Sequence, residues 1–137
     1  MSGLYTAVLG KVAAGYAQKS ALDTAAGQLT QEAGQSVASG IQGAIGDRRR
    51  AAYVASNARA RIAGGGLATT GTSAQETIGG IKGQGEFGAL TSLYQGEDRA
   101  SELNFRADQM RNQGDNAVAS GWLSGGTSFY GKYGATT

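Results

Sequence analysis

The chain has 137 residues with 24 Gly and neither Pro, Cys nor His, and its formal net charge is +2. This length allows one domain at most, and the charge is too small to indicate a general nucleic-acid binder. The missing Cys and His exclude disulfides, thiolate metal sites and the usual general base, so we expect neither an enzyme nor a cofactor.

Residues 1–20 are predicted to form a short amphipathic N-terminal helix, because Leu4, Val8, Val12 and Tyr16 recur every four residues. Two interpretations of this helix are open. It docks on its own protein or on a neighbour, or it inserts into a bilayer once several copies assemble. No segment is long enough for a conventional membrane span, and we expect a protein that is made in the cytoplasm and not exported by the ordinary route.

Residues 21–63 are predicted to form the first long helix. Its small and apolar residues recur at alternating spacings of four and three, which is typical of a helix seam. We expect this seam at Val37, Ile41, Ala44, Arg48, Ala51, Ala55, Ala58 and Ile62. Gly40, Gly43 and Gly46 interrupt the pattern and predict a bend or a break there.

Residues 64–73 are the expected Gly-rich turn. The run Gly64 to Gly66 ends the preceding helix, and Ser73 with Glu76 matches a capping box for the next one. The chain then reverses near residue 69, and positions equally far from that point should be neighbours in a hairpin. This rule places Arg48 to Arg50 across from Glu86 to Leu90.

Residues 74–121 are predicted to form the second long helix, with a regular seam of mostly Ala and Gly. Small residues let helix backbones approach closely, so we expect this seam to be an oligomer contact. Its members are Ala89, Leu93, Gly96, Ala100, Leu103, Ala107, Met110, Gly114, Ala117 and Gly121. On the polar face, Glu102 and Arg106 are placed as a favourable ion pair one turn apart.

Residues 122–137 form an aromatic, Gly-rich tail. In the hairpin its rings lie near those of the N-terminal segment, and together they are the candidate membrane or subunit contact. Interfacial anchoring in lipid and packing at a subunit contact both suit such rings. The candidates are Tyr5, Leu9, Trp122, Phe129 and Tyr133.

A basic segment is the remaining candidate site. Residues 48–75 hold five positive charges and no negative one. These side chains contact DNA phosphates, for example if copies form a ring with the Arg side chains in its lumen, or they pair with acidic residues of a neighbouring helix such as Glu76 and Glu86. The residues are Arg48, Arg49, Arg50, Arg59 and Arg61.

Several of these segments carry a family resemblance. They are the run from Arg48 to Tyr53, the segment from Asn57 to Ala63 with the Gly-rich turn after it, Thr72 to Glu76, Leu93 to Glu97, and the Gly-rich stretch from Ala119 to Gly126. In this order the sequence resembles the small internal virion proteins of short-tailed bacteriophages over roughly residues 45–130.

The resemblance implies a protein that lies inside the capsid near the portal, leaves with the genome and helps to form a conduit for DNA across the host envelope. It implies other internal virion, portal or tail proteins as partners, and the host outer membrane as a further one. A structural core or portal-associated scaffold that never touches lipid is the alternative. Altogether we expect a single all-α domain, a long helical hairpin with an added N-terminal helix, assembled from copies of itself as a ring.

Overall fold

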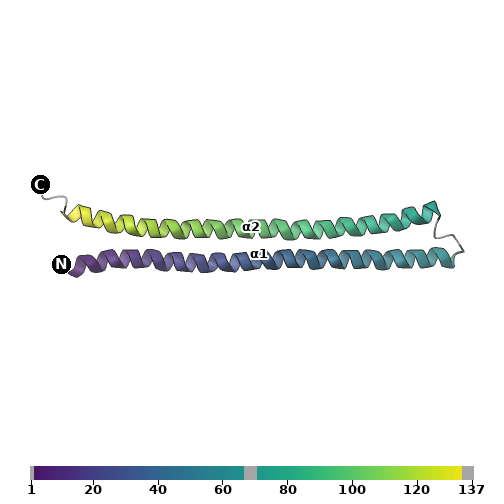
Figure 1. Cartoon of the computed structure of the whole chain (residues 1–137), viewed down its shortest axis with the longest axis horizontal. Helices are drawn as coiled ribbons and strands as arrows, with labels where there is room; N and C mark the ends of the chain where they lie inside the picture. Colours follow the sequence, from purple (N-terminus) through teal and green to yellow (C-terminus); the bar gives the residue numbers. More distant parts are fainter. Residues whose placement is uncertain (1, 67–70, 134–137) are drawn as a thin grey trace. The chain divides into compact units, whose positions relative to one another are not determined.

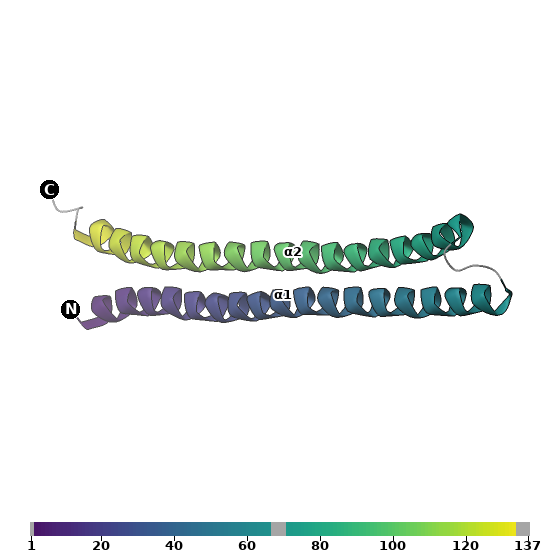
Figure 2. The same cartoon turned by 45° about the vertical axis from the view of Figure 1, so that its right-hand side comes forward.

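The computed structural model describes residues 2–66 and 71–133, and it describes the side chains of these residues except at positions 2, 4, 129, 132 and 133. Two α-helices make up this part of the chain, α1 from Ser2 to Gly64 and α2 from Thr72 to Tyr133. The two helices pack against each other as a hairpin, and Figures 1 and 2 show them running side by side. The expected all-α hairpin is confirmed.

Two of the expected helix boundaries are replaced by continuous helix. A separate N-terminal helix over residues 1–20 is not present, since α1 continues through residues 20 and 21 without a break. The segment from residue 122 is helical as far as Tyr133, so the described part of the expected tail belongs to α2. The physical reason is the same in both places: the chain has no Pro, and Gly inside a helix weakens it without ending it.

The connection between the helices begins with glycines. The amide of Gly65 donates to the carbonyl of Arg61, and that of Gly66 donates to the carbonyl of Ala63. Gly66 has a φ of 76°, a left-handed conformation that L side chains rarely adopt, which explains why glycine stands there. Residues 67–70 of the expected turn, with its midpoint at residue 69, lie outside the described residues.

The second helix begins two residues earlier than expected. The carbonyl of Gly71 accepts a hydrogen bond from the amide of Gln75, and α2 starts at Thr72. Ser73 therefore lies in the first turn of the helix and is not its N-cap, which corrects the predicted capping box. Gly71 occupies the capping position instead, and glycine is among the residues accepted there.

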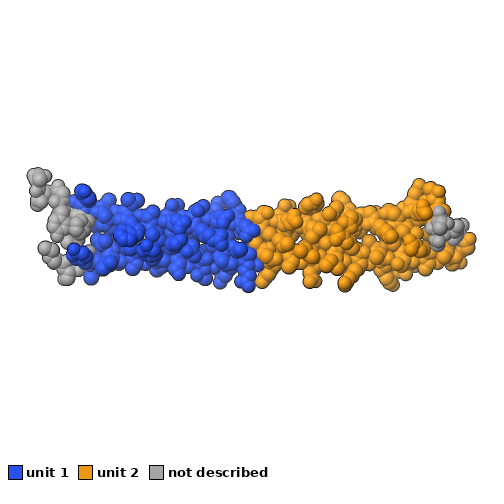
Figure 3. Space-filling view, in the orientation of Figure 1, with its two compact units in different colours: residues 1–32, 102–137 blue, residues 33–101 orange. Residues whose placement is uncertain are grey.

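The chain divides into two compact units, coloured in Figure 3. Unit 1 comprises Met1–Glu32 and Glu102–Thr137, and unit 2 comprises Ala33–Ser101. Each unit therefore contains one stretch of α1 and one stretch of α2.

The residues buried between the helices are small. Within the described residues, the buried apolar side chains are those of eight alanines with Ile78 and Leu103. A buried methyl group stabilises by about 0.8 kcal/mol, whereas a buried Leu side chain stabilises by roughly 1.5–3 kcal/mol. The packing of α1 on α2 therefore gains little hydrophobic free energy per residue.

Candidate functional site

The predicted seam of α2 lies between the two helices of the hairpin. All ten of its residues, from Ala89 to Gly121, are buried or half-buried. Their contacts are with α1 of the same chain: a Cβ on Gly96 would meet the backbone of Ser36 and Gly40, and one on Gly121 would meet the backbone of Lys11. The seam is thus an intrachain contact, and a second copy would have to displace α1 to use it as an oligomer contact.

The seam of α1 differs from the predicted one at two positions. Ile41 and Arg48 are exposed, and their neighbours Gly40 and Asp47 lie inside instead. The Asp47 carboxylate accepts a hydrogen bond of 3.1 Å from the Ser92 hydroxyl of α2. The helix also continues through Gly40, Gly43 and Gly46, where a bend or break was expected. Gly40 is held in the helix because the backbone of α2 packs against it.

The ion pair predicted between the helices of unit 2 is present. The guanidinium of Arg48 donates two hydrogen bonds to the Glu86 carboxylate, at 2.9 and 2.7 Å. The hydrogen bond from Arg48 lowers the pKa of Glu86 below its ordinary value, and the same bond raises the pKa of Arg48. The pair lies within the expected arrangement of Arg48 to Arg50 across from Glu86 to Leu90. The predicted Glu102–Arg106 pair within α2 is confirmed as well.

A row of large apolar side chains lies beside this ion pair. Ile41 and Ile45 precede Arg48 by seven and three residues, so the three share one side of α1. Leu90 and Tyr94 follow Glu86 by four and eight residues and share one side of α2. Because Arg48 and Glu86 bond across the helices, all four apolar residues line the same side of the hairpin. We call Ile41, Ile45, Leu90 and Tyr94 the apolar strip of unit 2; all four side chains are exposed.

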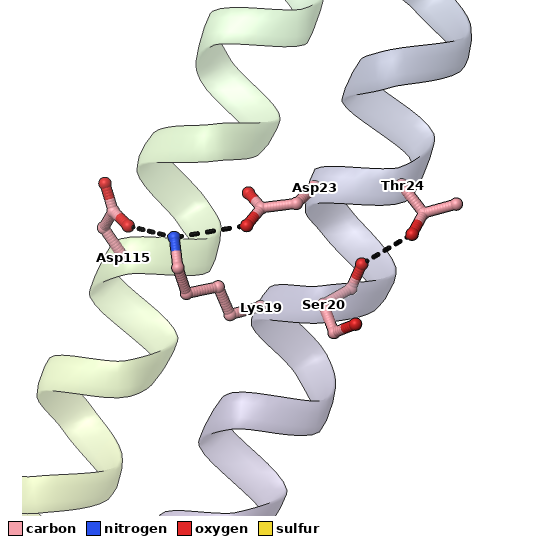
Figure 4. A network of polar contacts seen from close by, with 5 residues as sticks. All are labelled: Lys19, Ser20, Asp23, Thr24 and Asp115. Atoms are coloured by element: carbon pink, nitrogen blue, oxygen red, sulfur yellow. Dashed lines mark hydrogen bonds and ion pairs between the residues drawn. The ribbon is translucent and has the colours of Figure 1, made fainter.

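Unit 1 repeats this arrangement around another ion pair. The Lys19 ammonium donates to the carboxylate of Asp115 at 2.5 Å and lies 3.3 Å from that of Asp23 (Figure 4). The hydrogen bond to Asp115 has the largest effect in raising the pKa of Lys19, and the bond to Asp23 raises it further. Tyr16 precedes Lys19 by three residues, and Trp122 follows Asp115 by seven, so both rings lie on the side marked by the pair.

The apolar strip of unit 1 continues from Tyr16 toward the start of α1. Leu9 and Tyr5 precede Tyr16 by seven and eleven residues, which keeps them on its side of the helix. Tyr5, Leu9, Tyr16 and Trp122 are 67, 63, 51 and 58% exposed. Three of the five candidate contact residues therefore share one exposed strip. The side chains of the other two, Phe129 and Tyr133, lie outside the described residues.

Further large apolar side chains are exposed on the two units. They are Tyr53, Val54, Phe87, Phe105, Leu123 and Tyr130. Among the described residues, the buried positions are thus mostly Ala and Gly, while all aromatic side chains are exposed, which is unlike the core of a self-sufficient helical domain.

The basic segment lies on α1 in unit 2 with most of its charges unpaired. Arg48 is the member that bonds Glu86, while Arg49, Arg50, Arg59 and Arg61 are exposed and form no ion pair with any other described residue. The expected pairing of the whole segment with acidic residues of the neighbouring helix is therefore limited to one arginine. The sequence alone does not distinguish Arg48 from the other four arginines, because all five lie in one segment that holds no acidic residue.

An open groove lies on the opposite side of unit 2 from the Arg48–Glu86 pair. It has a volume of about 260 Å³. Val54 and Ile81 form apolar walls, and Gly85 packs so closely against Ala51 that a Cβ there would overlap its methyl group. Its lining residues are Asp47, Arg50, Ala51, Val54, Ile81, Gln84, Gly85 and Gly88.

Across the described residues, no cluster of three or more carboxylates is placed to hold a metal ion. In the same residues, neither helix contains a stretch long and apolar enough to cross a bilayer. No protein-family model, curated protein or solved structure matches the chain.

Proposed function

We propose that this chain is a non-enzymatic assembly protein that associates with copies of itself through its two apolar strips. The observation that carries this proposal is the placement of residue sizes: Ala and Gly make up most of the residues buried between α1 and α2, while every described Tyr, Trp and Phe side chain and the Ile and Leu side chains of the two strips are exposed. Exposed apolar patches of this kind mark sites of association with proteins or membranes. Covering Leu90 or Trp122 with a neighbouring hairpin supplies the hydrophobic free energy that the seam lacks.

The arrangement of charge favours a second copy as the neighbour. The apolar strip of unit 2 lies beside both an Arg48 cation and a Glu86 anion, and that of unit 1 lies beside Lys19 and Asp115. A two-fold contact between equal strips buries apolar groups against apolar groups and brings each charge near an opposite one. Pairs of hairpins of this kind are then the building blocks of a larger assembly such as a ring.

Combined with the resemblance of residues 45–130, this assembly suits an internal virion protein of a short-tailed bacteriophage. We propose that it resides in the capsid near the portal, is ejected with the genome and helps to form a conduit for DNA across the host envelope. A chain without Pro or Cys has no slow proline isomerisation or disulfide step to delay its refolding after ejection. Virions that lack this chain should attach normally and fail to deliver their DNA; delivery at normal efficiency would refute this role.

The strips are tested by comparing two matched double variants in unit 2. Ile45→Ser with Leu90→Ser removes two strip side chains, and Gln42→Ser with Gln95→Ser changes two exposed polar neighbours on the same helices. We expect wild type and the Gln variant to sediment as oligomers, and the strip variant to shift toward monomer with its helix content retained. Equal oligomer masses for all three proteins would show that the strip is not the contact.

A second candidate function is a scaffold inside the virion that never touches lipid. The ion pairs beside both strips favour it, because charged groups are common at the rim of protein interfaces and are costly against lipid. Leakage of dye from liposomes separates the two functions, since a conduit protein releases the dye and a scaffold leaves the liposomes intact.

A further inference from the structure

One face of unit 2 combines positive charge with hydrogen-bond donors. Arg50, Asn57 and Arg61 follow one another at spacings of seven and four residues, so they share one side of α1. Gln84 lines the same groove as Arg50 and places α2 on this face as well. We call Arg50, Asn57, Arg61 and Gln84 the basic face of unit 2. It lies on the opposite side of the hairpin from the apolar strip, because Arg50 follows Arg48 by two residues, slightly more than half a helical turn.

The charges of this face are available to a partner. Arg50 and Arg61 are exposed and bond no other described residue. The groove beside Arg50 has a single carboxylate in its lining, that of Asp47, which already accepts a hydrogen bond from Ser92. On the other side of the hairpin the Arg48 charge is neutralised by Glu86. Arg50 and Arg61 therefore place two unpaired positive charges on the side that the strip contact leaves uncovered.

We infer that the basic face of unit 2 binds the phosphate backbone of double-stranded DNA without reading its sequence. Arg50 and Arg61 lie about 16 Å apart along α1, from a rise of about 1.5 Å per residue. A duplex of that length carries about five phosphates on each strand. Arg guanidinium groups bond phosphate oxygens through two N–H groups, and Asn57 and Gln84 supply amide donors of the kind that contact the backbone.

This inference deepens the proposed function and rests on it for the choice of DNA over other polyanions. Strip-to-strip assembly repeats the basic face once per copy on the free side of the hairpins. A row of such faces along a conduit holds the passing genome by charge alone. Contacts of this kind break and re-form without a sequence barrier, which lets the duplex slide.

The test compares two double variants with the same loss of charge on the same helix. Arg50→Gln with Arg61→Gln removes both positive charges of the basic face. Arg49→Gln with Arg59→Gln removes two arginines that lie outside that face. Binding of the full-length chain to a fluorescent DNA duplex is measured as a function of salt, and the oligomer mass is measured in the same samples.

If both arginines of the basic face each contact one phosphate, the first variant should lower the salt slope by about 1.8 per chain. It should then bind the duplex on the order of 100-fold more weakly at about 50 mM salt, while the second variant keeps the slope of wild type. An equal loss in both variants would refute the assignment to this face, because it would indicate diffuse attraction.

Three other outcomes would overturn the inference. If wild type forms the oligomer but does not bind DNA at low salt, the DNA-binding inference is refuted and the proposed assembly is unaffected. A lower oligomer mass for Arg50→Gln with Arg61→Gln, with unchanged DNA binding, would assign the face to an acidic protein partner. Loss of binding to vesicles of anionic lipid, with unchanged DNA binding, would assign it to a membrane surface.

Discussion

The backbones of the two helices in unit 2 approach each other closely at Gly40 and Gly96, and alanine at either position tests this contact. A Cβ at residue 40 would lie 2.8 Å from the carbonyl oxygen of Ser92 and 3.2 Å from the Cα of Gly96. A Cβ at residue 96 would lie 2.8 Å from the carbonyl oxygen of Ser36. The obstructing atoms belong to the backbone, so no side-chain rotation relieves the overlap and the helices must move apart.

Two opposing effects set the size of the change for Gly40→Ala. Replacing Gly by Ala inside a helix gains about 1 kcal/mol. Forcing an extra methyl group into a packed interface costs about 1–3 kcal/mol. At Gly34, on the same helix and in the same unit, an added Cβ meets no atom within 4 Å, so only the gain remains. The stability of Gly40→Ala should therefore fall below that of Gly34→Ala by about 1–3 kcal/mol.

Thermal unfolding followed by far-ultraviolet circular dichroism measures this difference. All variants are compared at one protein concentration, because self-association raises the apparent stability. With a shift of about 4 °C per kcal/mol, Gly34→Ala should melt above wild type and Gly40→Ala should melt roughly 4–12 °C below Gly34→Ala. Equal stabilisation by the two substitutions would show that the backbones do not meet at this point.

Three further predictions concern single residues. Because the pKa of Glu86 is lowered, its carboxylate stabilises the fold above its ordinary pKa of 4.5, and this contribution is lost as the pH falls through the lower, folded-state value. Glu86→Gln should therefore flatten the acid limb of a plot of stability against pH. An unchanged acid limb would show that the bond with Arg48 does not form in solution. Gly66→Ala should cost about 1–2 kcal/mol in urea unfolding because of the positive φ, while Gly64→Ala, which has a regular helical backbone, should cost nothing. Leu103→Ala removes one of the few large buried side chains and should destabilise the fold by about 2–5 kcal/mol in the same assay. A smaller loss would show that the two helices are not closely packed around Leu103.

The Gly-rich turn predicted the hairpin, and the spacing of small residues predicted which face of α2 is buried, although that face was expected to contact other copies. Alternating steps of four and three identify a seam regardless of residue size, and the buried positions of α2 follow them from Ala89 to Gly121. The reversal near residue 69 placed Arg48 to Arg50 across from Glu86 to Leu90, a range that includes the observed Arg48–Glu86 pair but does not single it out.

The buried face of α1 was less predictable for a physical reason. Apolarity favours Ile41 over Gly40 as a seam residue, but two glycines that face each other allow a backbone contact that an isoleucine would prevent. Asp47 is likewise half-buried because Ser92 of α2 donates a hydrogen bond to it, and such a partner cannot be recognised from α1 by itself. The exposed strips have the same cause, because small residues at the helix contact leave large residues on the outer faces of the helices.

The position of the single tryptophan gives this chain a built-in optical reporter. Trp122 is 58% exposed, and its ring belongs to the strip of unit 1 and not to the space between the helices. Its fluorescence in an isolated hairpin should resemble that of indole in water, folded or unfolded, and should shift to shorter wavelengths only when another surface covers it. Dilution followed by emission spectra therefore separates the joining of subunits from the folding of each one without any added dye.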